Sequence, residues 1–230
     1  MGRLRDLYGP SSAILGIILA AGKFITLEGG EGAGKSTQAE LLAAALRDDG
    51  LIVMTTREPG GAPNAEAIRE LLLARRDDPW EPMTEALLHF AARRDHLTHA
   101  VQPAIDRGDW VISDRFADST MAYQSYGLGV ARSAIEALYR ETIGAFGPDL
   151  TIILDLPVEQ GLQRAAGRGV DADRYENMGL AFHRKLRDGF LDIARREPER
   201  CVVLDARPPM DEIGEKLIAV VRDRLGVGHG

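Results

Sequence analysis

A glycine-rich segment that ends in a lysine and a serine holds the residue types that bind polyphosphates. Residues 29–36 read Gly-Gly-Glu-Gly-Ala-Gly-Lys-Ser and fit the pattern G-x-x-x-x-G-K-[ST]. Glycines let backbone N–H groups turn inward around phosphate oxygens, and the N-terminus of a following helix adds partial positive charge. We expect Lys35 to reach the β- and γ-phosphates and Ser36 to ligate Mg²⁺ through its hydroxyl. The segment therefore predicts a nucleoside-triphosphate site.

Several arginines indicate a second anion site near the first. Arg57 and Arg115 each stand close after an apolar run, and Arg93 and Arg94 lie three and four residues after Phe90 in a helical pattern. At this spacing the ring and at least one guanidinium share a helix face. Guanidinium groups capture a phosphate monoester through paired hydrogen bonds, and a ring beside them is placed to stack on a base. Taken singly, each arginine is also explained by a surface ion pair.

A third basic group lies in the second half of the chain. Arg164, Arg168 and Arg174 span a stretch that contains Gly167 and Gly169. Glycines between basic residues favour a mobile flap, which closes over phosphates, excludes water and neutralises charge on the transferred group. The alternative is a solvated charged loop.

Short apolar runs alternate with helical patterns and predict the elements that position these residues. The runs span residues 24–27, 51–54, 110–112, 150–154 and 201–204. A helix is expected over residues 35–49 with its end at Gly50, two more helical patterns lie between residues 63 and 109, and two between 117 and 146. Nearly continuous apolar strands suit a parallel sheet that is covered on both faces. We predict a five-stranded, doubly wound α/β domain.

Acidic residues end four of the predicted strands, and these are Glu28, Asp114, Asp155 and Asp205. The carboxyl ends of parallel strands line the ligand crevice in such folds. We interpret Asp155 and Asp205 as helix caps or turn residues, and we expect Asp114 to hold Mg²⁺ through water.

The composition excludes several classes of protein. Of the 230 residues, 45% are hydrophobic and 27% charged, which is ordinary globular composition. The single cysteine, Cys201, excludes an internal disulfide and a zinc site built on paired cysteines. The net charge of −7 disfavours nucleic acid as a partner.

The N-terminal segment is expected to lie outside the core. Residues 13–21 are apolar and follow two arginines, which superficially resembles a signal peptide, but the stretch is too short to span a bilayer. We interpret residues 1–22 as an appended or mis-started extension and residues 23–228 as the domain. No other stretch is apolar enough to cross a membrane, so we expect a cytoplasmic protein without a membrane partner.

The motifs together resemble the thymidylate kinase family from about residue 23 to residue 225. The matching segments are residues 28–37 (EGGEGAGKST), 56–61 (TREPGG), 114–116 (DRF), 119–124 (STMAYQ) and the flap from Arg164 through residues 173–176 (DRYE). The resemblance implies a three-layer α/β fold of the P-loop NTPase type with a short mobile lid over about residues 164–177. It also implies that the γ-phosphoryl group of ATP is transferred to dTMP to give dTDP for dTTP synthesis, and that the protein is a homodimer.

The resemblance assigns roles residue by residue. The ATP-binding positions are Gly29, Gly30, Glu31, Gly32, Ala33, Gly34, Lys35, Ser36 and Thr37. The dTMP-binding positions are Glu31 at the sugar hydroxyl, Arg57, Arg93 and Arg115 at the phosphate, Phe90 stacked on thymine, Thr120 and Gln124 at the base, Tyr123 against the deoxyribose, and Tyr175 near the nucleoside. The catalytic positions are Lys35, Arg57, Arg115 and the lid arginines Arg164, Arg168 and Arg174, and the metal positions are Ser36 and Asp114.

One departure concerns the stacking ring. The family places this ring four residues before the phosphate arginine, whereas here His89 stands four residues before Arg93, and Phe90 stands four before Arg94. Either Phe90 stacks after a small change of register or Arg94 takes the arginine role, and we prefer Phe90 with Arg93.

The implied mechanism is in-line transfer without a covalent intermediate or a general base, because the acceptor is already a dianion. Mg²⁺, Lys35 and the arginines offset the repulsion between the two anions. One rival is a kinase for another monophosphate such as UMP or AMP. Another is a GTP-binding switch, but the chain has no N-K-x-D motif, and residues 114–117 do not form D-x-x-G.

Overall fold

The five expected strands form one parallel sheet. The computed structural model describes residues 22–74, 77–167, 175 and 178–227. Its strands are β1 (Phe24–Glu28), β2 (Val53–Arg57), β3 (Trp110–Asp114), β4 (Leu150–Asp155) and β5 (Cys201–Asp205), in the order β2-β3-β1-β4-β5. The expected α/β fold is confirmed. Of the expected extension over residues 1–22, only Gly22 falls within the described residues.

The second strand begins later than its apolar run predicts. The run covers residues 51–54, whereas β2 starts at Val53 and continues through two threonines to Arg57. Ile52 lies before the strand with 73% of its surface exposed. The strand continues because β2 pairs with β3 along its whole length, and this pairing aligns Arg57 with Asp114.

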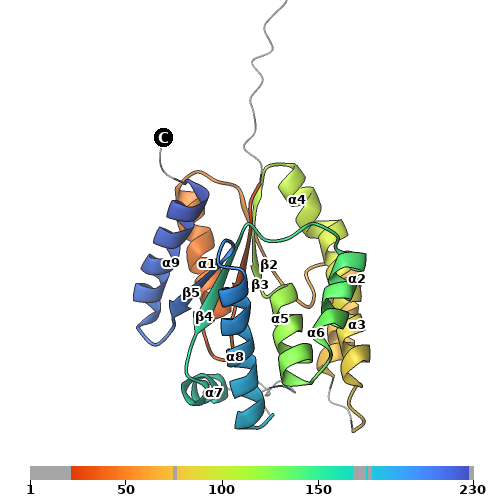
Figure 1. Ribbon diagram of the computed structural model, residues 1–230. Helices are drawn as coiled ribbons and strands as arrows, with labels where there is room; N and C mark the ends of the chain where they lie inside the picture. Colours follow the sequence, from red (N-terminus) through yellow and green to blue (C-terminus); the bar gives the residue numbers. More distant parts are fainter. Residues whose placement is uncertain (1–21, 75–76, 168–174, 176–177, 228–230) are drawn as a thin grey trace, which may run out of the picture.

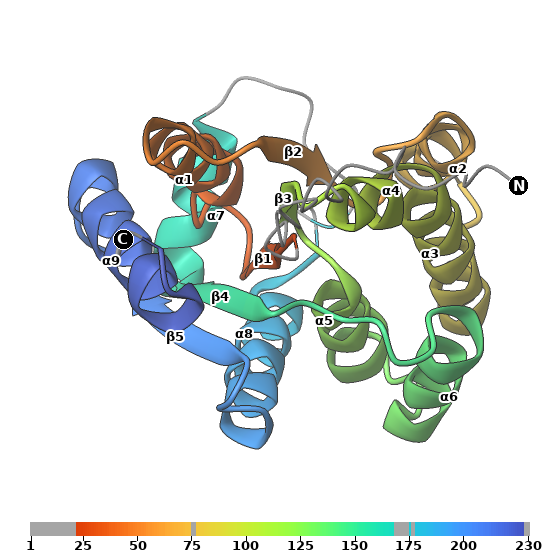
Figure 2. The same cartoon turned by 90° about the horizontal axis from the view of Figure 1, so that it is seen from above.

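Helices cover both faces of the sheet (Figure 2). They are α1 (Lys35–Asp48), α2 (Pro63–Leu73), α3 (Pro82–His96), α4 (Gln102–Asp106), α5 (Ala117–Thr120), α6 (Arg132–Thr142), α7 (Val158–Ala166), α8 (Leu180–Arg196) and α9 (Met210–Leu225). Seen from above, α1 and α9 lie on one side of the sheet, and α3, α4, α5 and α8 lie on the other.

Two of the helices continue through π-helical turns. The turn η1 (Leu97–Val101) joins α3 to α4, so that the helical pattern before β3 runs unbroken from Pro82 to Asp106. The turn η2 (Met121–Gly127) continues α5. A π turn widens the helix locally and changes which side chains share a face, and such turns are frequent at functional sites.

The residues of β1 alternate between the two hydrophobic cores. Ile25 and Leu27 belong to the core that α1 and α9 cover, whereas Phe24 belongs to the core on the opposite face. Because strand side chains alternate, Thr26 and Glu28 also point to the second face. There the Thr26 hydroxyl is 2.8 Å from the hydroxyl of Thr151. Buried polar groups therefore line this face of β1 up to the carboxyl end of the strand.

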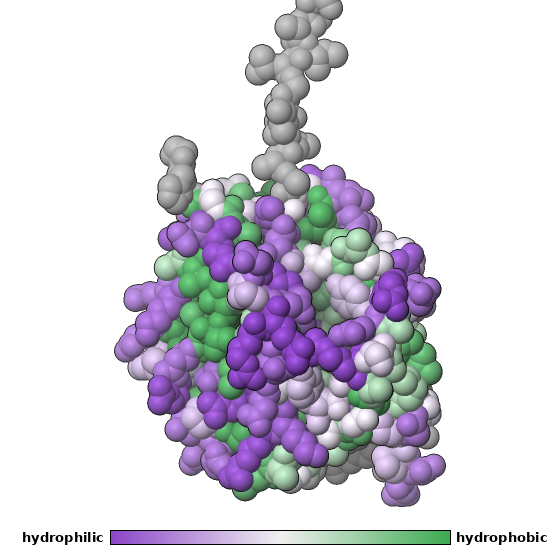
Figure 3. Space-filling view, viewed as in Figure 1, coloured by the Kyte–Doolittle hydropathy of each residue, from purple (hydrophilic) through white to green (hydrophobic). Residues whose placement is uncertain are grey.

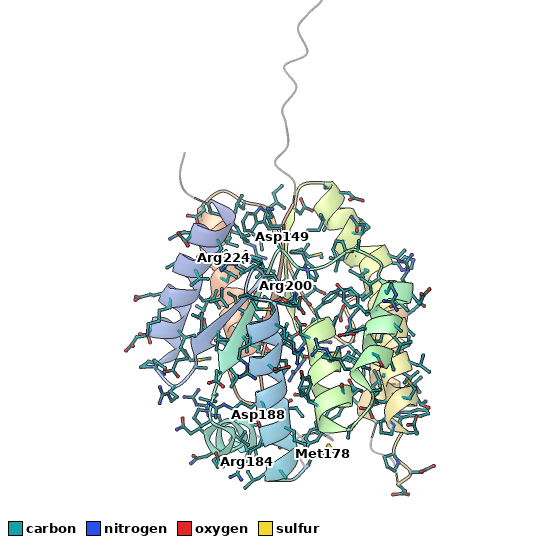
Figure 4. All side chains as sticks on the ribbon, in the orientation of Figure 1. Asp149, Met178, Arg184, Asp188, Arg200 and Arg224 are labelled. Atoms are coloured by element: carbon teal, nitrogen blue, oxygen red, sulfur yellow. The ribbon has the colours of Figure 1, made fainter. Side chains whose placement is uncertain are left out.

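The carboxyl ends of the strands meet at one edge of the molecule. In Figure 1 the start of β1 and the end of α9 lie at the top, and α7 and the start of α8 lie at the bottom. Figure 4 shows Arg184 at this lower end, where its guanidinium is 2.7 Å from Glu159 on α7. The strands run towards this edge, and their order reverses at β1, which is where open α/β sheets bind ligands.

Arg200, in the connection between α8 and β5, is joined to α5 by an ion pair. Arg200 lies near the centre of the molecule in Figure 4, and its guanidinium forms two hydrogen bonds to Asp118, of 2.7 and 2.9 Å.

The visible face is largely hydrophilic, and hydrophobic residues show beside α9 (Figure 3). The edge strand β5 leaves Val203 40% exposed. Among the described residues, no helix is long and apolar enough to cross a membrane.

Candidate active site

The glycine-rich segment forms a tight turn between β1 and α1. Gly32 has φ +68°, and a Cβ there would stand 2.0 Å from the carbonyl oxygen of Gly161, so a larger residue does not fit. Gly34 has φ +91° and stands directly before the first residue of α1. The backbone N–H groups of residues 35–37 are therefore free of intrahelical partners and are available to an anion.

Lys35 is folded back over this turn. Its side chain is 7% exposed, and Nζ donates hydrogen bonds to the carbonyl oxygens of Gly29 at 3.1 Å and Gly30 at 2.8 Å. Burial, with the positive charge of Arg115, lowers the pKa of Lys35 to about 8. The ammonium thus lies over the glycine-rich turn and loses its proton more readily than an exposed lysine does.

Ser36 and Asp114 offer oxygen atoms beside the turn. The Ser36 hydroxyl donates to Asp114 Oδ2 at 2.5 Å, and Asp114 Oδ1 is buried without a hydrogen-bond partner among the described residues. No cluster of three or more His, Cys, Asp or Glu in the described ranges could hold a metal ion. One hydroxyl and one carboxylate suit Mg²⁺, which takes its remaining ligands from water and substrate phosphates. These two residues fit the expected metal.

Arg115 lies between the glycine-rich turn of residues 29–36, which we call the P-loop turn, and a cavity on the second face of the sheet. Its guanidinium donates to the Gly29 carbonyl oxygen at 3.3 Å, to Ser119 Oγ at 3.2 Å and to Glu31 Oε1 at 2.8 Å. Burial acts to lower the pKa of Arg115, but Tyr123 and Glu31 raise it above its ordinary value, so the group stays charged. Arg115 also has φ +73°, a conformation that costs a residue with a Cβ about 1 kcal/mol or more.

Glu28 holds the turn that carries Arg115. One carboxylate oxygen accepts from the backbone N–H groups of Phe116 at 2.7 Å and Ser119 at 3.2 Å, and the other accepts from the Ser119 hydroxyl at 2.6 Å. Burial, with the nearby Asp118 carboxylate, raises the pKa of Glu28 to about 7. The last residue of β1 thus fixes the backbone that follows β3.

A cavity opens beside Arg115, between the P-loop turn and the helices on the second face. Its lining residues are Glu31, Glu58, Pro59, Arg69, Leu73, His89, Arg93, Arg115, Phe116, Ser119, Thr120, Tyr123, Gln124 and Tyr175. Seven of the nine residues expected to bind the acceptor nucleotide are in this set: Glu31, Arg93, Arg115, Thr120, Tyr123, Gln124 and Tyr175.

Arg93 is held in the cavity by a buried network. Nε donates to Glu58 Oε2 at 2.7 Å, and Nη2 donates to Thr120 Oγ1 and to the Phe116 carbonyl oxygen, both at 3.0 Å. The remaining Nη1 is buried without a partner among the described residues. His96, which is fully buried, contacts the second oxygen of Glu58 through Nδ1 at 2.9 Å. The arginine is therefore rigidly placed with one donor left over.

The expectation that Phe90 lines the site is wrong in this structure. Phe90 is 1% exposed and belongs to the hydrophobic core, and the Arg93 guanidinium lies over its ring at 4.9 Å. His89, one residue earlier, lines the cavity instead, and its Nε2 is 3.5 Å from the Tyr175 hydroxyl. The physical reason is helical phase, because successive residues of an α-helix point about 100° apart, so that His89 faces the cavity while Phe90 faces the hydrophobic core. Arg94 points elsewhere and donates to the Thr142 carbonyl oxygen at 3.2 Å.

The π turn η2 presents two polar groups to the cavity. The Tyr123 hydroxyl donates to Glu31 Oε1 at 2.5 Å, and the Arg115 guanidinium lies 5.1 Å from its ring centroid. Burial raises the pKa of Tyr123 well above its ordinary value, so the phenol stays protonated. Gln124 is fully buried and donates through Nε2 to Glu85 Oε1 at 2.7 Å.

Two of the expected arginines lie away from the cavity. The side chain of Arg57 is 57% exposed and lies 3.3 Å from Glu66, although the pairing of β2 with β3 places its backbone beside Asp114. Arg164 donates to the carbonyl oxygens of Ala206 at 3.0 Å and Arg207 at 3.3 Å, beyond β5. Arg168 and Arg174 lie outside the described residues.

The two remaining strand-end aspartates pair with arginines. Asp155 receives two hydrogen bonds from Arg187, and Asp205 receives its contacts from Arg207, including one from the backbone N–H at 3.0 Å. Neither residue lines the cavity beside Arg115.

Sequence reasoning missed several residues of the cavity and its support, and these are Glu58, Arg69, Glu85, His89 and His96. Glu58 stands next to Arg57 in the Arg-Glu-Pro-Gly motif, and this position could have indicated that Glu58 belongs to the site. For His89 and His96 the signal was their spacing of four and three residues from Arg93, since such spacings share a helix face. Glu85 stands four residues before His89 and continues the same face.

Comparison with known proteins agrees with this geometry. A family model described as thymidylate kinase matches residues 27–217. The thymidylate kinase of Caulobacter vibrioides is 54% identical over 209 residues, which are 91% of this chain and 100% of that protein. That of Nitrobacter hamburgensis is 50% identical over 209 residues, which are 90% of this chain and 91% of that protein. A crystal structure of thymidylate kinase from Ehrlichia chaffeensis, 33% identical, superposes with a TM-score of 0.69 and covers 87% of this chain and 99% of its own.

Proposed function

The chain belongs to the thymidylate kinase family and phosphorylates dTMP to dTDP with ATP, and we propose that the cavity beside Arg115 holds dTMP while the P-loop turn holds ATP. The observation that carries this proposal is the position of Arg115, which contacts both Gly29 of the turn and Glu31 of the cavity. A guanidinium in this position reaches the donor and acceptor phosphates together.

The reaction needs no general base, because the acceptor phosphate is already a dianion near neutral pH. The obstacle is repulsion, which amounts to about 4 kcal/mol for each pair of unit charges 4 Å apart at an effective dielectric constant near 20. Lys35 and Arg115 are both charged and buried at the junction and offset this repulsion. When bound at Ser36 and Asp114, Mg²⁺ would neutralise further phosphate charge. In-line transfer then depends mainly on positioning.

Arg57 completes the phosphate contacts in this proposal. Its backbone is paired with Asp114, beside Arg115, and its exposed ion pair with Glu66 is weak enough to be exchanged for a dianion. The lid arginines Arg164, Arg168 and Arg174 stay assigned to the transferred group on the family resemblance alone.

The nucleobase is recognised at the inner end of the cavity. Arg93 Nη1 is a buried donor and Gln124 Oε1 a buried acceptor, and neither has a partner among the described residues. Thymine offers a carbonyl oxygen next to N3–H, which matches one donor and one acceptor. We therefore propose that Arg93 binds the base rather than the phosphate, and that the imidazole of His89 takes the place of the stacking ring.

The sugar is recognised by Glu31 and Tyr123. Their hydrogen bond of 2.5 Å holds the Tyr123 ring at the cavity wall, beside Arg115. We propose that Glu31 accepts from the sugar hydroxyl and that the ring leaves no room for a 2′-hydroxyl, so that ribonucleotides are rejected.

A coupled assay for ADP release tests the proposal. We expect dTMP to exceed UMP, AMP and dCMP as acceptor, and we expect Arg115→Ala to lower kcat/KM for both substrates by a factor of about 100 or more. Preference for UMP or AMP, or an Arg115→Ala enzyme with normal kcat/KM, would contradict it.

We also propose a cytoplasmic homodimer. The helices α2 and α3 pack against each other and expose Leu71 and Leu87, at 49% and 50%. Exposed leucines on paired helices suit a surface that a second copy covers. The mass in solution, measured by light scattering, should be twice that of the chain, and Leu87→Lys should lower it towards the monomer. A monomeric wild type would contradict this part of the proposal.

A further inference from the structure

A fully buried carboxylate lies behind the cavity, and the chemistry described above does not use it. Glu85 on α3 is 0% exposed. Its Oε1 accepts a hydrogen bond from Gln124 Nε2 at 2.7 Å and a second one from the Tyr175 hydroxyl. We propose that Glu85 is a positioning residue, which fixes the orientation of the Gln124 amide and thereby determines which pyrimidine edge the cavity accepts.

The two ends of the Gln124 amide differ in hydrogen bonding, because Nε2 donates and Oε1 accepts. A carboxylate only accepts hydrogen bonds, so it requires a donor from its neighbour. Gln124 satisfies this requirement with Nε2, whereas a flipped amide would place Oε1 against the carboxylate oxygen and leave both without a proton between them. Glu85 thus selects one of the two orientations, and the Tyr175 hydroxyl supplies the second donor to the same oxygen.

The Oε1 end of the Gln124 amide is left without a partner among the described residues. With Nε2 held by Glu85, Oε1 of Gln124 is buried and has no partner among the described residues, while Gln124 itself lines the cavity. A buried acceptor without a partner destabilises the site, and a ligand that brings a donor removes this destabilisation. The cavity therefore favours a ligand with an N–H at this point.

The unpartnered Oε1 of Gln124 favours a pyrimidine that carries a proton on N3. Thymine and uracil carry a proton on N3, whereas N3 of cytosine is an acceptor and would face the lone pairs of Gln124 Oε1. A site built to pair with a substrate N–H rejects an analogue that lacks it far more strongly than an apolar pocket does. Glu85 therefore confers selection for the 4-oxo pyrimidines without touching the base. This inference rests on the proposal that Gln124 faces the base.

The variant Glu85→Gln tests the role of the carboxylate. A glutamine keeps the shape but donates as well as accepts, so the Gln124 amide is free to turn. We expect kcat/KM for dTMP relative to dCMP to fall by about tenfold or more, mainly through a higher KM for dTMP. The KM for ATP should stay unchanged. Glu136→Gln, the same substitution at a half-exposed position on α6, is the control and should leave the ratio at its wild-type value.

Two further variants keep the outcome decisive. The aspartate of Glu85→Asp packs less well, but its carboxylate still only accepts hydrogen bonds. This variant should therefore retain more of the preference for dTMP over dCMP than Glu85→Gln does, even when both variants lower the melting temperature. The inference would be overturned if Glu85→Gln had the same ratio of kcat/KM for dTMP to kcat/KM for dCMP as the wild type. It would also be overturned if Glu85→Asp lowered this ratio more than Glu85→Gln does. If Gln124→Ala leaves the ratio unchanged, the proposed base contact fails as well. If it lowers the ratio while Glu85→Gln does not, only the role of Glu85 fails.

Discussion

Ser36 Oγ, at the start of α1, lies 2.5 Å from Asp114 Oδ2, at the end of β3. The two residues are 78 positions apart in the sequence, and the parallel pairing of β1 with β3 brings their elements together. The pair shows how the sheet places a hydroxyl from the start of α1 against a carboxylate from the end of β3.

This pair predicts a specific metal dependence. We expect removal of Mg²⁺ by chelation to abolish turnover, and we expect Asp114→Asn to raise the Mg²⁺ concentration for half-maximal rate by about tenfold to a hundredfold, because an amide holds metal-bound water less strongly. Titration of the rate with Mg²⁺ at saturating ATP and dTMP measures this. An unchanged midpoint would remove Asp114 from the metal site.

Lys35 predicts a loss of activity and a dependence on pH. Lys35→Met should abolish turnover and leave a cooperative thermal transition, because it removes the ammonium and its two hydrogen bonds to the turn but leaves both hydrophobic cores intact. In the wild type the pKa of about 8 means that the free enzyme loses the ammonium charge as pH rises through that value.

We therefore expect kcat/KM for ATP to fall above pH 8, and kcat to fall only at higher pH, because bound phosphates favour the charged lysine. Pre-steady-state and steady-state rates measured from pH 6 to 10 distinguish the pH dependence of kcat/KM for ATP from that of kcat. A kcat/KM that stays flat to pH 9.5 would contradict the assignment.

The fold and the tight turn of the glycine-rich segment could be predicted from the sequence because local patterns determine them. The glycines at 32 and 34 stand where positive φ is needed, and the apolar runs are buried on both faces as their composition predicts. Arg115 and Tyr123 also line the cavity, because they stand directly after a strand end and one to two helical turns beyond it, and their contacts with dTMP stay a prediction.

The position of Phe90 could not be predicted, because composition favoured an aromatic ring while helical phase placed that ring in the core. His89 occupies the helix position that faces the cavity, and a histidine in a sequence does not by itself indicate stacking on a base. The outward position of Arg57 was equally hidden, because its ion pair with Glu66 depends on a turn that holds Glu66 at the Gly61 N–H, 2.8 Å away.

Glu28 predicts a change of stability with pH. Its pKa is raised from 4.5 to about 7, so between these values the folded state binds a proton that the unfolded state does not. The free energy of unfolding should therefore fall as pH rises from 5 to 7 by an amount on the order of 1–3 kcal/mol from this residue. Glu28→Gln should remove that slope. Urea unfolding of both proteins between pH 4.5 and 8 measures the difference, and parallel curves would contradict the prediction.

His96 predicts that two similar substitutions have different effects. Its Nδ1 contacts Glu58 and its Nε2 lies 2.7 Å from the Thr56 hydroxyl, so the ring links β2 to the carboxylate that orients Arg93. The amide of an asparagine reaches nearly as far as Nδ1, and that of a glutamine nearly as far as Nε2. We expect His96→Asn to keep the KM for dTMP within about threefold of the wild type, whereas His96→Gln loses the Glu58 contact and raises it by about tenfold.

The KM for ATP serves as the internal control for both His96 variants, since Lys35 and Ser36 lie outside this network. Steady-state kinetics with each substrate varied in turn gives the comparison, and melting temperatures show how much of any change is loss of packing. If the glutamine variant binds dTMP as well as the asparagine variant does, the link from His96 through Glu58 to Arg93 has no part in holding the nucleotide, and the histidine serves only to fill the space beside Gly61.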